Sequence, residues 1–141
     1  RRLDRKADRY GPRRRSSFFL ELGPILAEHI AQHVRLNTPD ENGETRRQRN
    51  ERFGLLATDL DPVHPDFEYL LEWFWDISAG RSHGFSGPNP LSMTEIANWS
   101  ALIGTVIRRE EIAILRAMDA AFMSAVAKEQ AAASERATNK E

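Results

Sequence analysis

Two histidines four residues apart, His29 and His33, are the first side chains whose spacing could support chemistry. Residues at this spacing share one face of a helix, as the paired histidines of many zinc sites do. The segment lacks the glutamate of the HExxH pattern, and the sequence offers no third ligand nearby. The chain has no cysteine, which excludes a cysteine-type zinc site. We therefore interpret both histidines as amphipathic helix positions and expect neither a metal nor another cofactor.

A second candidate is the segment around Ser86, which partly matches the nucleophile elbow of hydrolases. The Gly-x-Ser-x-Gly pattern that starts at Gly84 requires a glycine at the position that Pro88 occupies. It also requires a strand before the serine, whereas the sequence predicts a helix there. No histidine, carboxylate or second nucleophile has a spacing that would complete an active site. We expect no catalytic residue and predict that the protein is not an enzyme.

Asp119 is a polar residue in a position where the helical pattern places apolar side chains. It lies seven residues after Ile112 and three before Phe122, so the three share one face of a helix. A buried carboxylate requires a partner or a raised pKa. Arg81 is our candidate for that partner. We predict a structural ion pair between Arg81 and Asp119, because buried pairs are more often structural than catalytic.

The helices predicted on either side of Gly104 have the order of a helix-turn-helix motif. The second helix of such a motif reads DNA, and here its first turn carries Glu110 and Glu111. Two carboxylates that face a phosphate backbone are unfavourable, because most of the affinity of these motifs comes from cationic contacts. We therefore do not favour nucleic acid as a partner. Non-specific contact through the basic residues at 1–15 and 46–52 stays open as an alternative.

The composition divides the chain into four regions. Residues 1–17 are basic and poor in apolar side chains, so we expect a flexible arm. Residues 18–60 form an N-terminal helical region, residues 61–127 a helical domain, and residues 128–141 a polar tail that frays. No segment alternates as a strand does, and no apolar run approaches the ~20 residues of a membrane span. The sequence predicts an all-α fold, a small bundle of four to five helices without a membrane segment.

The clearest helix start is Ser92, which can cap the backbone NH of Glu95 while the Glu95 side chain reaches back. Gly104 is placed to end this helix. We expect four apolar residues to form its buried face: Ile96, Trp99, Leu102 and Ile103. A further helix is predicted in the amphipathic segment 18–36, with Pro24 in its first turn, and others over residues 65–79 and 108–127.

The helix predicted over residues 65–79 carries more apolar surface than a surface helix needs. Within residues 67–77, Glu68, Glu72 and Asp76 fall in one narrow arc, and aromatic and aliphatic residues fill the rest. Either this helix is the centre of the bundle, or part of its aromatic surface is kept for another protein. We predict four partner contacts on it: Tyr69, Trp73, Phe74 and Trp75. Tyr69 and Trp73 are expected to be exposed, and the alternative that both belong to the core stays open.

Several spaced segments between residues 62 and 126 form one pattern. They are Leu71–Ser78, Gly80–Ser82, Gly87–Ser92, Glu95 and Ile96 with Trp99, Glu111, and Leu115–Phe122. The pattern resembles the tail assembly chaperones of long-tailed phages, whose relatives occur in prophages and gene-transfer particles. Residues 1–60 carry none of this pattern, so a different activity of that region stays open.

The resemblance implies a small helical protein whose chaperone-like domain is formed by residues 61–127. Such a protein binds the hydrophobic tape-measure protein in the cytoplasm of the bacterial host, recruits tail-tube subunits and then leaves. Homo-oligomerisation stays open. Two other functions also remain: a structural tail or neck component retained in the particle, and a small regulator that binds nucleic acid through its basic N-terminal region.

Overall fold

The computed structural model describes residues 12–55 and 60–140, with side chains described from residue 19 onward. The predicted all-α fold is confirmed, since most of these residues are helical. The helical elements are α1 (Pro12–Asn37), α2 (Arg46–Arg52), the 3-10 turn η1 (Pro65–Phe67), α3 (Glu68–Ala79), α4 (Met93–Ile103) and α5 (Arg109–Thr138). A short antiparallel hairpin, β1 (His83–Gly84) and β2 (Gly87–Pro88), connects α3 with α4.

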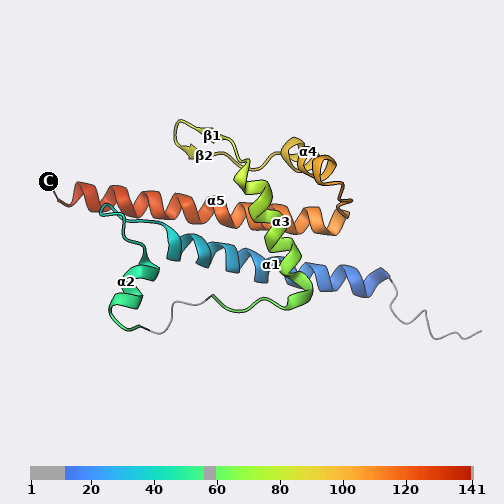
Figure 1. The fold of residues 1–141 in the computed structure, drawn as a ribbon, viewed down its shortest axis with the longest axis horizontal. Coiled ribbons are helices and arrows are strands. Elements are labelled where there is room, and N and C mark those ends of the chain that lie inside the picture. Colours follow the sequence, from blue (N-terminus) through green and yellow to red (C-terminus); the bar gives the residue numbers. More distant parts are fainter. Residues whose placement is uncertain (1–11, 56–59, 141) are drawn as a thin grey trace, which may run out of the picture.

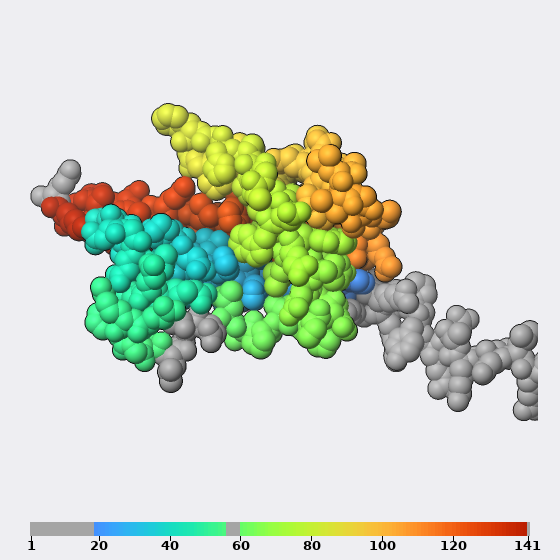
Figure 2. Space-filling model, in the orientation of Figure 1, coloured from blue at the N-terminus to red at the C-terminus, as the bar shows by residue number. Residues whose placement is uncertain are grey.

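The two long helices, α1 and α5, lie side by side and run in the same direction (Figure 1). α3 crosses this pair, and the hairpin and α4 follow it (Figure 1). Figure 2 shows the hairpin and α4 as two separate projections on one side of the molecule, with α2 on the other side. The architecture is therefore a layer of two parallel helices crossed by a third, and α4 stands away from that layer.

The core lies where α3 crosses the α1–α5 layer. Its fully buried side chains come from all three helices: Leu26 and Ile30 of α1, Leu70 and Phe74 of α3, and Leu115 and Met118 of α5. Removing apolar side chains from water is the main favourable term in folding, so each of these helices depends on the other two. The predicted N-terminal region and the predicted domain over residues 61–127 thus share one core.

Helix α1 differs from the prediction at its start. It begins at Pro12, so residues 12–17 of the predicted arm are helical, while residues 1–11 lie outside the described part of the chain. Pro24 is exposed within α1 instead of occupying a first turn. A proline inside a helix removes one backbone hydrogen bond. The helix continues through this loss because Leu22 and Leu26, on either side of Pro24, are buried in the core.

Helix α5 is longer than predicted. It continues to Thr138, although the sequence of residues 128–141 predicts a fraying tail. The segment is rich in alanine, glutamate and other strong helix formers, which favour a helix even without a buried face. Arg46 of α2 also lies 3.3 Å from Glu129, so a contact from another helix stabilises this part of α5.

The ends of α4 are those that the sequence predicts, but its covered face is smaller. Ser92 Oγ accepts the backbone NH of Glu95 at 3.1 Å, and Gly104 ends the helix at a left-handed φ of 74°. The predicted buried face is wrong in two positions, because Leu102 is 87% exposed and Ile103 is 55% exposed. α4 projects from the body and packs against α3 on one side (Figure 2), so its apolar pattern exceeds the surface that covers it.

Candidate functional site

Three rings from α3 and α4 form a row that we call the aromatic edge: Tyr69, Trp73 and Trp99. The ring of Tyr69 meets that of Trp73 edge-on with centroids 4.9 Å apart, and Trp73 lies 5.7 Å from Trp99. An edge-to-face pair at the Tyr69–Trp73 distance contributes beyond the area that it buries. All three side chains are partly exposed. The aromatic edge therefore joins α3 to α4 and still presents apolar surface to water.

Hydrogen bonds hold the polar ends of this row. Tyr69 donates its hydroxyl to Glu111 Oε1 at 2.9 Å, and the other Glu111 oxygen accepts the backbone NH of Arg108 at 2.8 Å. Trp99 Nε1 donates to Asp76 Oδ2 at 2.6 Å. Burial, together with the hydrogen bond and charge of Glu111, raises the pKa of Tyr69 to about 12. With the polar atoms of Tyr69 and Trp99 satisfied within the chain, these two rings are left with apolar faces for contact.

Trp75 and Phe74 lie elsewhere on α3. The Trp75 ring is 4.6 Å from His33 of α1 and 5.1 Å from Phe74, so Trp75 packs toward α1 and away from the aromatic edge. Phe74 has no exposed surface. We predict all four aromatic residues of α3 as partner contacts from the sequence, and the burial of Phe74 removes it from that set. A side chain at the centre of the core cannot reach a partner while the helices stay packed.

Arg81 and Asp119, the predicted structural ion pair, lie together in the structure. Arg81 Nη1 is 2.6 Å from Asp119 Oδ1, and both residues are buried. Asp119 Oδ2 accepts the backbone NH of Leu91 at 2.9 Å, and Arg81 Nη1 donates to the carbonyl oxygen of Asn89, also at 2.9 Å. Asp119 Oδ1 has no hydrogen bond of good geometry, so its contact with Arg81 is one of charge. The pair fastens the loop that leads into α4 onto α5.

The charges that α3 itself places next to the aromatic edge are negative, while Arg108 supplies a positive charge near Tyr69. Glu68, Glu72 and Asp76 are exposed on α3, a helix that contains no basic residue. Among the described residues, neither Glu68 nor Glu72 has an ion-pair partner. Unpaired charges that border an apolar surface favour a partner of opposite charge.

A further apolar surface lies on α4 and the residues after it, and sequence reasoning missed it. We call it the α4 surface, and it consists of Leu102, Ile103 and Val106, with exposed fractions of 87%, 55% and 89%. A signal for it exists in the sequence, because Glu95 is the one charged residue of α4. A helix that is apolar on most sides needs cover from another element or from a partner.

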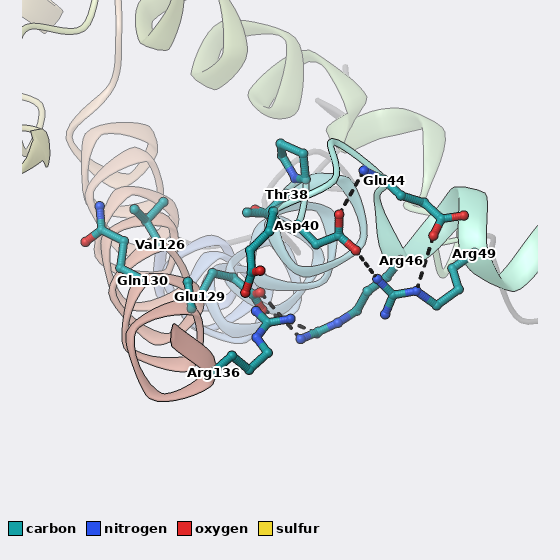
Figure 3. Close-up of a pocket in the computed structure, with 12 residues that line it drawn as sticks. Thr38, Asp40, Glu44, Arg46, Arg49, Val126, Glu129, Gln130 and Arg136 are labelled. Carbon is teal, nitrogen blue, oxygen red and sulfur yellow. Dashed lines mark hydrogen bonds and ion pairs between the residues drawn. The ribbon is translucent and has the colours of Figure 1, made fainter. Parts of the chain in front are cut away.

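The arginines of α2 have polar partners within the chain. A pocket where α2 and the segment before it face α5 is lined mainly by charged side chains (Figure 3). Each arginine of α2 has a polar partner: Arg46 with Glu129, Arg47 with Asn37, Arg49 with Asp40 and Arg52 with Glu44. Backbone NH groups of Glu44 and Asn42 lower the pKa of Asp40 and keep its charge available to Arg49. These arginines are therefore engaged by acids and an amide instead of being free for phosphates.

The histidine pair and the segment around Ser86, for which the sequence analysis favoured no function, have ordinary structural surroundings. The ring of His33 packs against that of Trp75 at a tilt of 47°, and burial lowers the pKa of His33. His29 Nδ1 lies 3.3 Å from the carbonyl oxygen of Asp61. Within the described residues, no three metal-ligating side chains form a group.

Ser86 lies in the turn of the hairpin, where its carbonyl oxygen accepts a hydrogen bond from Gln130. No helix over the described ranges is long and apolar enough to cross a membrane.

Comparison with known proteins gives one match. A family model described as phage tail assembly chaperone matches residues 49–124, more than half of the 141 residues. No curated protein and no solved structure matches the chain. The matched segment contains the aromatic edge, the Arg81–Asp119 pair and the α4 surface. α1 lies outside it, although α1 contributes part of the core against which α3 packs.

Proposed function

The chain belongs to the phage tail assembly chaperone family, and we propose that it binds the tape-measure protein and recruits tail-tube subunits during tail assembly. The family supports protein partners in tail assembly and a role in binding without catalysis. In this proposal the protein acts in the cytoplasm of the bacterial host. It holds an apolar segment of the tape-measure protein until tail-tube subunits replace it.

The observation that carries the proposal is the partly exposed aromatic edge beside unpaired acids. Aromatic side chains supply much of the energy at protein interfaces, because each buries a large apolar area at low cost in conformational entropy. An amphipathic client helix would lay its apolar face on Tyr69 and Trp73. Glu68 and Glu72, which lack ion-pair partners among the described residues, favour basic residues on the flank of that helix.

The proposed contacts lie on two different sides of α3. Tyr69 and Trp73 present their faces on the aromatic edge, and Trp99 extends the row onto α4. Trp75 remains a proposed contact through its exposed part, on the side of α3 that packs against His33. Because these positions lie on different sides of α3, single substitutions can tell which side the client uses.

Co-purification with the tape-measure protein tests this proposal. Trp73→Ala should remove most of the bound tape-measure protein, because a ring at the centre of the proposed contact is lost. Trp75→Ala tests the α1 side of α3 in parallel, because Trp75 is also a proposed contact, and Leu20→Ala, at an exposed apolar residue of α1, is the control. All three variants are first shown to be folded by their unfolding transitions. Full recovery of the tape-measure protein by folded Trp73→Ala would refute the aromatic edge as its site.

A charge reversal tests the chemistry of the client. Glu72→Lys should weaken binding of the tape-measure protein, because an attractive charge becomes repulsive. The remaining binding should also depend less on salt concentration. Glu21→Lys is the control, since Glu21 is an exposed glutamate on α1. Equal effects of the two substitutions would show that net charge, and not the border of the aromatic edge, controls binding.

A further inference from the structure

The α4 surface is exposed on a helix that is firmly built. Ser92 and Glu95 form a capping box at its start, and Gly104 ends it in the left-handed conformation. Trp99 of the same helix donates a hydrogen bond to Asp76 on α3. Fraying of the helix is therefore not the reason that the three apolar side chains of the α4 surface face water. They face water because no described element covers them.

A groove runs along another side of α4, where Met93 and Val106 line it and Leu102 and Ile103 do not. It has a volume of about 590 Å³ and runs between α4 and the residues that lead into α5. Along α4 it is lined by the small side chains Ala97, Ser100 and Ala101, and the opposite wall includes Val106 and Ile112. No charged side chain lines it. Small residues allow a second helix to approach closely, and helices pack at interaxial distances of roughly 8–10 Å.

The α4 surface continues the aromatic edge. Trp99 belongs to the edge through its contact with Trp73, and Leu102 and Ile103 follow it by one helical turn on α4. Residues three and four apart on a helix are neighbours on its surface. One apolar track therefore leads from Tyr69 on α3 to Leu102 and Ile103 on α4.

The size of the α4 surface argues against a second copy of the chain as its stable partner. Full burial of one aliphatic side chain removes on the order of 100 Å² from water. At the exposed fractions of Leu102, Ile103 and Val106, the three side chains together offer roughly 230 Å². A stable dimer needs about 800 Å² from each partner. The α4 surface by itself is therefore too small for the interface of a stable dimer.

We propose that the α4 surface and the aromatic edge form one site for a single amphipathic helix of the client. The helix lies along the track, with basic residues beside the acids of α3 and uncharged apolar residues over α4. This inference rests on the proposed function for the identity of the client. Its chemistry can be tested without the tape-measure protein.

The test uses a synthetic helical peptide with a leucine face and lysines along one flank, and its affinity is measured by fluorescence anisotropy. Leu102→Asp should weaken binding at least about tenfold, since an apolar contact is lost and a charge enters an uncharged surface. Val106→Asp is a second variant with the same expectation. Both residues are almost fully exposed, so neither substitution should prevent folding.

Leu20→Asp is the matched control. Leu20 is 76% exposed and lines a different apolar groove, between α1 and α5. The peptide should bind this variant as it binds the unaltered chain. Loss of binding on Leu20→Asp with retention on Leu102→Asp would move the site to the α1–α5 groove and overturn the inference. Failure of the unaltered chain to bind the peptide would also overturn it.

Two further outcomes separate this inference from the proposed function. If Trp73→Ala loses the tape-measure protein while Leu102→Asp retains both that protein and the peptide, the function stands and the continuous site is wrong. Sedimentation of the chain alone tests the second copy as occupant. A concentration-dependent dimer that Leu102→Asp abolishes, with peptide binding unchanged, would assign the α4 surface to self-association and contradict the inference.

Discussion

Helices α3 and α4 have similar apolar patterns and opposite surroundings. α3 carries three of the four predicted partner contacts as partly exposed rings, yet α1, α5 and α4 surround it, and Phe74 at its centre is fully buried. α4 has Ile96 as its one buried residue and exposes Leu102 and Ile103. The comparison teaches that a hydrophobic pattern measures how much apolar surface a helix has, and that the neighbouring elements decide how much of it is covered.

The largest expected difference between the two helices concerns Phe74. Phe74→Ala should lower the free energy of unfolding by about 4 kcal/mol, because it removes a fully buried ring and leaves a cavity among α1, α3 and α5. Urea-induced unfolding, followed by circular dichroism, measures this change. A loss below about 1 kcal/mol would mean that α3 is not the centre of the core.

The next effect concerns the attachment of α4. Asp119→Ala should cost about 3 kcal/mol, because it leaves the buried Arg81 guanidinium without its carboxylate. The backbone NH of Leu91 loses its acceptor as well, so the loop into α4 should exchange its amide hydrogens faster. Glu28→Ala, at an exposed acid of α1, is the control and should change stability by less than about 0.5 kcal/mol. Equal effects of the two substitutions would contradict a structural role for the pair.

A smaller effect on the free energy of unfolding is expected at high pH, where Tyr69 loses its hydroxyl proton. Its pKa is raised from 10.0 to about 12 in the folded protein, so the folded state holds the hydroxyl proton more tightly than the unfolded state does. The resulting stability is fully present below about pH 10 and is lost as the pH rises toward 12. Since the ring is partly exposed, we expect a contribution of roughly 2 kcal/mol at most. Tyr69→Phe should lack this dependence, and identical profiles of the two proteins between pH 10 and 12 would contradict the Tyr69–Glu111 hydrogen bond.

The smallest expected effect is on α4 itself. Leu102→Ala should change the free energy of unfolding by less than about 0.5 kcal/mol, because the side chain is already 87% in water. The same substitution in a buried position would cost about 2–5 kcal/mol. Thermal and urea unfolding of this variant measure the difference directly. A loss in the buried range would show that another part of the chain covers α4 in solution.

Features of the fold that depend on neighbours in the sequence could be predicted. The capping box of Ser92 and Glu95 and the left-handed Gly104 follow from local rules, and both lie where those rules place them. The helical spacing around Asp119 identifies it as a residue of the apolar stripe. Asp119 Oδ1 lies 2.6 Å from Arg81 Nη1, so the periodicity pointed to a carboxylate that has a charged partner in the structure.

Features that depend on distant segments could not be predicted. Whether Leu102 and Ile103 are buried depends on which helices lie over α4, and no periodicity within the helix contains that information. The same holds for Trp75, whose environment is set by His33 of α1. The sequence analysis missed the helical end of α5 for a different reason. An alanine-rich polar segment without an apolar stripe is typical of a tail, although its intrinsic propensity favours a helix.

The central claim is that the client binds across the aromatic edge and the α4 surface. Hydrogen–deuterium exchange of the chain, alone and with purified tape-measure protein, tests it most directly. We expect added protection in peptides that cover residues 68–80 and 93–107, while those that cover α1 stay unchanged. Protection confined to α1 and the facing side of α5, with exchange in α3 and α4 unaltered, would contradict the claim and place the client in the groove between the two long helices.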